Sequence, residues 1–340
     1  MGEGDQGCRH QAGLAPVPLA STSSSGTAVN LLHVGSTTPS AGILLSIAQE
    51  RGIFARHGLD VRPVFVPGTE IPEPSAANPF GLIGAPAAIM RASSGAGLKI
   101  LACFNNARIS GRLIAAPSIT EPQQLRGARV GVRALGAGQW IQSLIALEFL
   151  GLDAARSNIR MLAIGDEAQI VRALEAGDID AALFSTAQGH RLKARGFSDL
   201  LDLFPANLHG FPNALAVTIT ELERAPHSAQ SMVAALTESM AFSLAPRNQS
   251  LVVDTISRLA RISDPAAARA SYQDFLLTAV RKPYPCVDRL LQMQKIMALQ
   301  NPNVLETNVH ELIDDSFVRR LDDSGEIDRL NATADAGGLG

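Results

Sequence analysis

Cysteine and aromatic residues are scarce in this chain of 340 residues. Its three cysteines, Cys8, Cys103 and Cys286, lie far apart and form no C-x-x-C pair, which argues against a disulfide framework and against a structural zinc site. Aromatic residues amount to 4% of the sequence, so stacking platforms for nucleic-acid bases are not expected. The core must be built mainly from Ala, Leu, Ile and Val.

Long apolar runs and an excess of either charge are also missing. Apolar runs such as Ile43–Ile47 are far shorter than the roughly 20 residues that cross a bilayer. Lys plus Arg (29) nearly balance Asp plus Glu (32), and the formal net charge is -3, which gives no reason to expect nucleic acid or a membrane surface as partner. The stretch from Gln11 to Ala20 is broken by two prolines and does not resemble an export signal.

The chain is long enough for two domains. Residues 1–28 combine Gly, Ser, Thr and Pro without periodicity and are expected to form a disordered tail, as are residues 331–340. From Val29 the pattern predicts a strand, a small polar turn and a helix that ends near Gly52, followed by a second strand over Val61–Val66. This is the order of a βαβ unit.

The same order of elements returns later in the chain. Ala128–Arg133 is typical of a strand, Ala134–Gly138 of a Gly-rich turn, Gln139–Leu150 of a helix and Ile159–Ile164 of a second strand. Gly-Leu-Asp follows the helix in both copies. Two copies predict two α/β lobes, each with its own parallel or mixed sheet flanked by helices, rather than a solenoid.

Short apolar segments set the predicted limits of the lobes. We expect Phe80–Ile83, Lys99–Phe104 and Arg112–Ala116 to finish the first sheet, and the passage Pro117–Pro122 to lead out of it. Ala214–Thr220 is predicted to return to the first lobe, where the following helices pack. The predicted domains are a discontinuous first lobe, 29–116 and 214–330, and a second lobe, 117–213.

Four segments resemble those of a known family. Ala48–Phe54 followed by His57–Val61 resembles the opening of the nitrate, sulfonate and taurine solute-binding proteins of ABC importers, the NMT1/THI5-like proteins. Leu125–Val132 is similar to that family's entry into the second lobe, Ala173–Ala181 to its helix-to-strand step, and Gly84–Ala88 to a turn after a first-lobe strand. The resemblance implies a two-lobed periplasmic-binding-protein-like fold of type II, with a cleft that closes on a ligand.

The resemblance also implies partners and a location. It implies a small organic molecule or anion as ligand (sulfonate-, nitrate- or taurine-like, or an aromatic acid), a membrane permease of an ABC importer as partner, and no cofactor. We expect a monomer without a nucleic-acid partner. The family location is periplasmic or at the cell surface, but a cytoplasmic location stays open because no export signal is visible. Thr69–Pro79 departs from the family pattern, and its three prolines predict a loop that reshapes one wall of the cleft.

Ligands of open parallel sheets bind beyond the carboxyl ends of the strands, where turns lead into helix N-termini. We expect four such turns, two from each lobe, to form the walls of the cleft. They offer backbone N–H groups, hydroxyls, amides and one tryptophan. The candidate ligand-binding residues are Ser36, Thr37, Thr38, Ser40, Gly84, Ala85, Pro86, Gly136, Gly138, Gln139, Trp140, Ser185, Thr186 and Gln188.

Simpler roles compete with ligand contact at several of these positions. The hydroxyls of the first turn are also typical helix caps, and Trp140 is equally well explained by core packing. Arg133 or Arg191 would supply a cation to the cleft, although arginines usually stay exposed. Asp178 and Asp180 are better explained by turn chemistry than by proton transfer.

No catalytic constellation emerges from the sequence. The seven histidines are scattered, and the chain has neither an H-E-x-x-H pair nor a G-x-S-x-G elbow. We therefore favour a binding protein over an enzyme. Two alternatives on the same fold stay open: a ligand sensor, and a cytoplasmic enzyme acting on a small acid, of the thiamine-precursor or menaquinone-pathway type. The first enzyme type requires a Cys-rich iron motif that the chain lacks, and the second requires cleft acids or bases that the sequence does not place.

Overall fold

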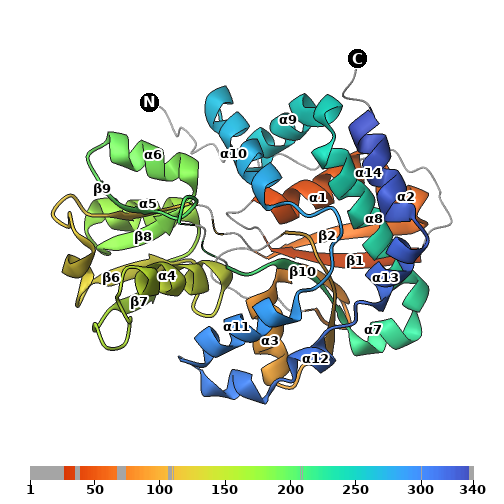
Figure 1. The fold of residues 1–340 in the computed structure, drawn as a ribbon, viewed down its shortest axis with the longest axis horizontal. Coiled ribbons are helices and arrows are strands. Elements are labelled where there is room, and N and C mark those ends of the chain that lie inside the picture. The colour runs from red at the N-terminus through yellow and green to blue at the C-terminus, as the bar shows by residue number, and fades with distance from the viewer. Residues whose placement is uncertain are drawn as a thin grey trace, which may run out of the picture.

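The chain forms two lobes, each built on a five-stranded sheet (Figure 1). The structure is a computed structural model that describes residues 27–34, 39–66, 74–105, 109, 111–206, 208, 210–299 and 301–336, without the side chains of 27–41, 63–66 and 336. The strand order is β2-β1-β3-β10-β4 in the first sheet and β7-β6-β8-β5-β9 in the second. The predicted α/β architecture with two mixed sheets is confirmed.

The first sheet combines parallel and antiparallel pairs. β1 pairs in parallel with β2 and with β3, whereas β10 runs antiparallel to β3 and β4. β3 and β10 are buried along nearly their whole length, as expected for strands covered by helices on both faces. The strands are β1 (Thr27–Val34), β2 (Leu59–Val66), β3 (Phe80–Gly84), β4 (Leu98–Cys103) and β10 (Asn213–Thr218).

The second sheet has the same mixed character. β6 pairs in parallel with β7 and β8, and β5 runs antiparallel to β8 and β9. The parallel pairs β1/β2 and β6/β7 are the two predicted βαβ copies, which the structure confirms. The strands are β5 (Arg112–Ala115), β6 (Arg129–Val132), β7 (Arg160–Ala163), β8 (Ala181–Phe184) and β9 (Ser198–Asp202).

Helices cover both sheets, and the C-terminal helices gather around the first lobe (Figure 1). The second lobe carries α4 (Gly138–Phe149), α5 (Glu167–Ala176) and α6 (Thr186–Ala194). The remaining α-helices are α1 (Pro39–Glu50), α2 (Ile53–Arg56), α3 (Ala85–Ser93), α7 (Ile219–Arg224), α8 (Pro226–Leu244), α9 (Gln249–Leu259), α10 (Pro265–Thr278), α11 (Val287–Ala298), α12 (Val309–Leu312), α13 (Ser316–Asp323) and α14 (Glu326–Ala336). Short 3-10 turns occupy Pro122–Leu125, Pro246–Asn248 and Pro302–Glu306.

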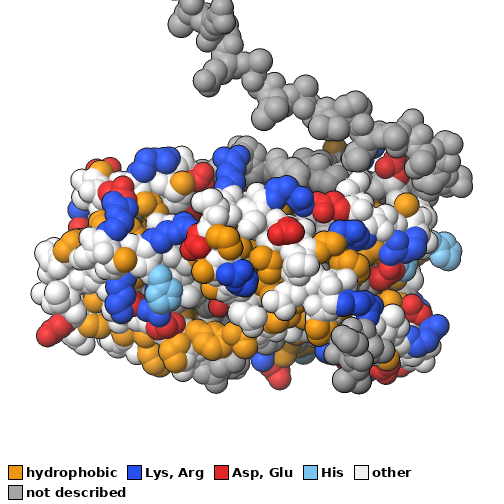
Figure 2. Space-filling model, turned by 90° about the horizontal axis from the view of Figure 1, so that it is seen from above, with side chains coloured by type: hydrophobic (Ala, Val, Ile, Leu, Met, Phe, Trp, Pro, Cys, Tyr) orange, Lys and Arg blue, Asp and Glu red, His pale blue; other side chains and the backbone are white. Residues whose placement is uncertain are grey.

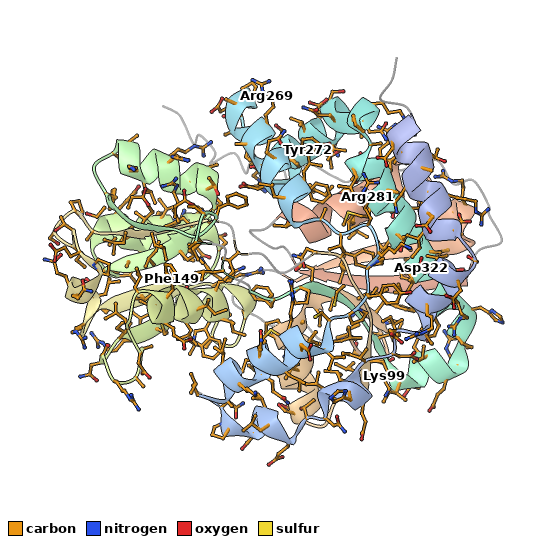
Figure 3. The ribbon with its side chains drawn as sticks, in the orientation of Figure 1. Lys99, Phe149, Arg269, Tyr272, Arg281 and Asp322 are labelled. Atoms are coloured by element: carbon orange, nitrogen blue, oxygen red, sulfur yellow. The ribbon has the colours of Figure 1, made fainter. Side chains whose placement is uncertain are left out.

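Polar contacts fasten the C-terminal helices to the chain that follows α10. Asp322 of α13 accepts hydrogen bonds from Lys282 Nζ at 2.6 Å and from the Tyr284 hydroxyl at 3.0 Å (Figure 3). Tyr272 of α10 is fully buried in the core of the same lobe. The end of the chain is therefore part of the first lobe's structure.

Two segments connect the lobes and lie side by side. Ile109 donates its backbone N–H to the carbonyl of Leu208 at 2.9 Å, and Leu203 donates to Gly111 at 3.0 Å. The Asn105 side chain accepts a hydrogen bond from the backbone N–H of Asn213 at 2.8 Å. Paired connecting segments of this kind are where a two-lobed protein bends when its lobes close.

Three predicted boundaries are wrong. β5 lies in the second sheet between β8 and β9, so Arg112–Ala116 does not finish the first sheet, and the chain leaves the first lobe before residue 112 rather than after residue 116. The predicted tails also begin and end elsewhere, because Thr27 and Ala28 belong to β1 and residues 331–336 complete α14. Of the predicted loop Thr69–Pro79, residues 67–73 lie outside the described residues, and 74–79 form no helix or strand.

The surface carries both charge signs. Figure 2 shows Lys and Arg side chains interspersed with Asp and Glu over the visible face. Among the helices that the structure describes, none is long and apolar enough to span a membrane.

Candidate functional site

A cavity of about 290 Å³ lies between the two lobes. This volume is close to the lower end of the range for small-molecule sites. From the second lobe it is lined by Gln139, Gln142, Glu167, Ala168, Val171, Leu183, Phe184, Ser185, Thr186, Ala187, Gln188 and Arg191. From the first lobe and the connecting segments it is lined by Asn105, Phe211, Asn213, Ala260, Ile262, Ser271, Asp274, Phe275 and Thr278.

The N-terminus of α6 forms one wall of the cavity. Ser185 caps this helix by accepting a hydrogen bond at Oγ from the Gln188 N–H at 3.3 Å. The Ser185 N–H itself donates to Oε1 of Glu167 at 2.8 Å. A carboxyl group of the chain therefore occupies the end of α6 at which the helix dipole favours negative charge.

Gln139 joins the start of α4 to the neighbouring strand ends. Its Nε2 donates to the carbonyl of Leu183 at 2.6 Å, and its Oε1 accepts from the backbone N–H of Arg133 at 2.8 Å. Both ends of the amide are thereby used inside the protein. Gln139 holds the β6–α4 turn and the end of β8 in place while its side chain lines the cavity.

Phe211 lines the cavity, and its ring lies near the N-termini of two helices. A Cβ built on Gly138, the first residue of α4, would lie 2.0 Å from Cζ of Phe211. A Cβ on Gly84, just before α3, would lie 3.4 Å from Cε2 of the same ring. Glycine is therefore required at position 138 for the ring to keep its place, because no real Cβ approaches another atom so closely.

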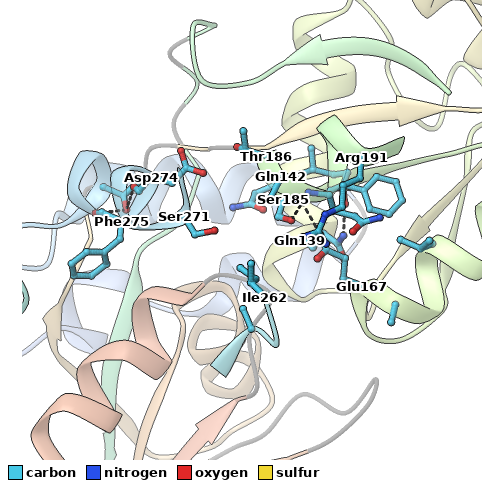
Figure 4. A pocket seen from close by; sticks show the side chains of 18 of the residues that line it. Gln139, Gln142, Glu167, Ser185, Thr186, Arg191, Ile262, Ser271, Asp274 and Phe275 are labelled. Atoms are coloured by element: carbon cyan, nitrogen blue, oxygen red, sulfur yellow. Dashed lines mark hydrogen bonds between the residues drawn. The ribbon is translucent and has the colours of Figure 1, made fainter. Parts of the chain in front are cut away.

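The first lobe contributes a carboxyl group, Asp274 of α10. Thr186 of α6 lies close enough on the other side of the cavity for its hydroxyl to act on this carboxyl group. Burial raises the pKa of Asp274 above its usual value, and nearby Asp202 adds to the rise. In Figure 4, Asp274 and Ser271 lie on one side of the cavity, with Gln139, Ser185 and Glu167 opposite.

Glu167, the first residue of α5, is the second carboxyl group of the cavity. Burial raises its pKa, while the hydrogen bonds from Ser185 and the charge of Arg191 oppose that rise. Asp166, the residue before it, caps α5 by accepting a hydrogen bond from the Gln169 N–H at 2.8 Å. The cap fixes the first turn of α5 and thereby the position of Glu167.

The structure brings together some of the predicted site residues. Gln139, Ser185, Thr186 and Gln188 line the cavity. Gly84 and Gly138 contact Phe211, which lines it. Ala85, Pro86 and Gly136 are not among the described lining residues, and neither is Arg133. Arg191, which the sequence offered as a possible cation, does line the cavity.

Trp140 lies in the core rather than at the cavity. Its side chain is 4% exposed and packs with Ile141 and Leu144 of the same helix in an apolar cluster. It is not among the described lining residues. Of its two predicted roles, the structure therefore favours core packing.

The first predicted turn falls largely outside the described part of the chain. Ser36, Thr37 and Thr38 lie outside the described residues. Ser40 is the second residue of α1, but its side chain is not described. Their contribution to the cavity stays a prediction.

Several lining residues have no clear sequence signal. Asp274 sits inside a regular helix, and Phe211 lies in an irregular segment between β9 and β10. Only Glu167 had a local signal, because it follows the capping residue Asp166 directly. Across the described ranges, no group of three or more His, Cys, Asp or Glu residues is placed to hold a metal ion.

Asp180 has a structural role. Its Oδ2 accepts from the backbone N–H of Arg129 at 2.7 Å and from Nε of the same residue at 3.0 Å, and its Oδ1 accepts from Nη2 at 2.7 Å. These hydrogen bonds hold the pKa of Asp180 below its usual value. The turn role that the sequence favours fits these contacts.

Comparison with known proteins identifies a family and a shared fold. The sequence model described as "NMT1/THI5 like" matches residues 40–249, more than half of the chain. None of the curated protein sequences compared with the chain matches it significantly.

Solved structures with the same fold include binding proteins and an enzyme. The nitrate-binding protein NrtA of Synechocystis PCC 6803 has a TM-score of 0.70 at 12% identity, covering 89% of this chain and 90% of its own. A putative sulfonate ABC transporter protein, SsuA of Methylobacillus flagellatus KT, has a TM-score of 0.65 at 14% identity, covering 89% of this chain and 96% of its own. The desulfurization enzyme DszB has a TM-score of 0.62 at 17% identity, covering 86% of this chain and 98% of its own. The predicted periplasmic-binding-protein-like fold is confirmed.

Proposed function

The chain belongs to the NMT1/THI5-like family, and on this premise we propose that it is a solute-binding protein that captures a small organic molecule between its lobes. The observation that carries the proposal is the cavity of about 290 Å³, whose walls come from both lobes and from the segments that connect them. A ligand that contacts both lobes stabilises the closed arrangement over an open one, because only closure brings both walls to it.

The transport context is a further part of the proposal. The similarity to a protein described as a sulfonate ABC transporter component supports a role in which the closed, loaded protein delivers its solute to a membrane permease. A periplasmic or cell-surface location and a monomeric state follow from that role. A ligand sensor would use the same cavity without a permease.

A thermal-shift screen of solutes tests the binding proposal. A solute that binds only the folded protein stabilises it by about 2.7 kcal/mol at a concentration 100 times its Kd. We expect members of one chemical class to raise the melting temperature of the full chain. If nitrate, sulfonates, taurine, aromatic acids, amines and amino heterocycles all leave it unchanged, the proposal fails.

A second candidate function is an enzyme that acts on a small molecule by proton transfer. Glu167 and Asp274 favour it, because both are carboxyl groups with raised pKa values that line one cavity, and such groups are common acids and bases in active sites. The shared fold with a desulfurization enzyme supports keeping it. NMR spectra of each stabilising solute before and after incubation with the protein decide between the two, because proton transfer can rearrange a molecule without changing its mass. New signals that disappear with Asp274→Asn establish the enzyme, and unchanged spectra leave the binding protein.

A further inference from the structure

We propose that the ligand carries a positively charged or hydrogen-bond-donating nitrogen group, and that Asp274 binds this group. The inference rests on the proposed solute-binding function and names its ligand class: an amine- or amidine-bearing organic molecule rather than a nitrate- or sulfonate-like anion. It follows from what occupies three helix N-termini around the cavity, those of α3, α4 and α6, and from the position of Asp274 on its wall.

The N-terminus of α3 is closed to an anion. The N–H of Ala85 donates to the carbonyl of Pro212 at 2.9 Å, and the next residue, Pro86, has no N–H to offer. The Phe211 ring lies beside Gly84 at the same helix end. Of the first two backbone donors with which this helix N-terminus could hold an anion, one is therefore used and the other is missing.

The N-terminus of α4 is covered by the same ring. Phe211 lies so close to Gly138 that even a methyl group at that position would overlap it. The aromatic ring thus stands over the first residue of the helix, where an anion would have to approach. The amide of Gln139, the next residue, is hydrogen-bonded at both ends to the chain.

The N-terminus of α6 already holds an anion of the protein itself. Glu167 accepts the N–H of Ser185 at 2.8 Å, and Arg191 lies close enough for its charge to act on the same carboxyl group. The Ser185 N–H is therefore used by a carboxyl group of the chain, on which the charge of Arg191 also acts. A second anion bound beside Glu167 would be repelled by it.

Asp274 has no salt-bridge partner among the residues that the structure describes. It lines the cavity from the opposite lobe, and the neutral hydroxyl of Thr186 faces it from α6. The charged groups that act on it are Asp202 and His190. A half-buried carboxyl group without a salt bridge is stabilised by a ligand that brings a cation, because the pair forms charge-assisted hydrogen bonds in a partly desolvated site.

A matched pair of probes tests the charge preference. Benzamidine and benzoate have similar size and shape but opposite charge, and both are small enough to be tried in a cavity of this volume. Titration of the full-length protein, followed by calorimetry or by ligand-observed NMR, is expected to show benzamidine binding about tenfold or more tightly than benzoate, which is the usual scale for one charge-assisted hydrogen bond.

Two variants locate the effect. Asp274→Asn removes the charge while keeping the size and one side-chain oxygen, and is expected to weaken benzamidine binding about tenfold. The control Asp254→Asn removes a charge from the exposed face of α9 in the same lobe and is expected to leave the affinity unchanged.

The contrary results separate this inference from the solute-binding function. If benzoate binds as tightly as benzamidine or more tightly, or if Asp274→Asn leaves the preference intact, the inference is overturned, while binding of either probe in the cavity still supports solute binding. If neither probe binds, the inference is overturned, and solute binding is decided by the separate thermal-shift screen.

Discussion

The ring of Phe211 lies against Gly138, the first residue of α4, with Cζ only 2.0 Å from the place where a Cβ would stand. Phe211 comes from the segment that connects the lobes, and Gly138 from the second lobe. The contact therefore joins the hinge region to a helix that borders the cavity. It depends on the absence of a single side-chain atom.

Replacing Gly138 with alanine is expected to displace this ring. The free energy of unfolding should fall by about 1–3 kcal/mol, the usual cost of overpacking. The control is Gly97→Ala. A Cβ at Gly97 would lie 3.6 Å from the Ile219 side chain, which is an ordinary contact, so this variant should lose little unfolding free energy. Urea unfolding of both variants provides the comparison. The double variant Gly138→Ala with Phe211→Ala also removes the ring, so its loss of unfolding free energy should be smaller than the sum of the losses in the two single variants. If the two losses simply add, the two residues are not in contact.

Arg112 is expected to be indispensable to the second lobe. Its guanidinium pairs with Asp199 and, at 2.5 Å, with Asp202, and only 12% of its side chain is exposed. Arg112→Met leaves both carboxylates without this partner, and breaking a buried pair in this way costs about 3–5 kcal/mol.

Arg195→Met provides the matched control for Arg112. Arg195 pairs with Glu175 in the same lobe, but 55% of its side chain is exposed. An exposed pair contributes about 1 kcal/mol or less. Fluorescence of Trp140, the only tryptophan of the chain and a core residue of this lobe, reports the unfolding of both variants. Equal losses in the two would contradict the buried network.

The stability of the unliganded protein should depend on the charge of Asp274. Burial raises the pKa of this carboxyl group in the folded state, whereas in the unfolded chain it is about 3.9. The folded state therefore holds the proton more tightly, so its stability falls as the pH rises from the unfolded value through the folded one. Below the unfolded value the penalty is absent.

Asp274→Asn carries no such penalty. It is expected to melt at a higher temperature than the original protein at pH 7, with a difference that shrinks as the pH is lowered toward about 4. Thermal melts across this range, with Asp254→Asn as an exposed control, measure the effect. A variant that melts at a lower temperature at pH 7 would show that Asp274 is not a destabilising group in the empty cavity.

The two βαβ copies could be predicted from the sequence because their signals are local. Each copy has a strand, a small-residue turn and an apolar-periodic helix that ends before Gly-Leu-Asp, and the structure pairs β1 with β2 and β6 with β7 in parallel. Residues in the turns that follow strands of both sheets were predicted to meet in a cleft, from the equally local signal of small or polar residues before a helix. Four of them, Gln139, Ser185, Thr186 and Gln188, line the cavity.

The remaining features depend on contacts between distant parts of the chain. β5 is a four-residue apolar strand that pairs antiparallel with β8 and β9, and nothing in those four residues says which sheet they join. Asp274 reaches the cavity only because α10 packs opposite α6. Trp140 is apolar and flanked by a turn, which suits a ligand wall as well as a core, and only packing decides between them.

The central claim is that one solute molecule binds in the cavity between the lobes, and a calorimetric titration of three proteins tests it most directly. The solute is the one that stabilises the original chain most, and the variants are Ala168→Trp, which fills the cavity, and Ala176→Trp, on the exposed end of the same helix. We predict saturable binding of one molecule per chain to the original protein and to Ala176→Trp, and loss of binding in Ala168→Trp. Equal affinity in all three proteins would contradict the account.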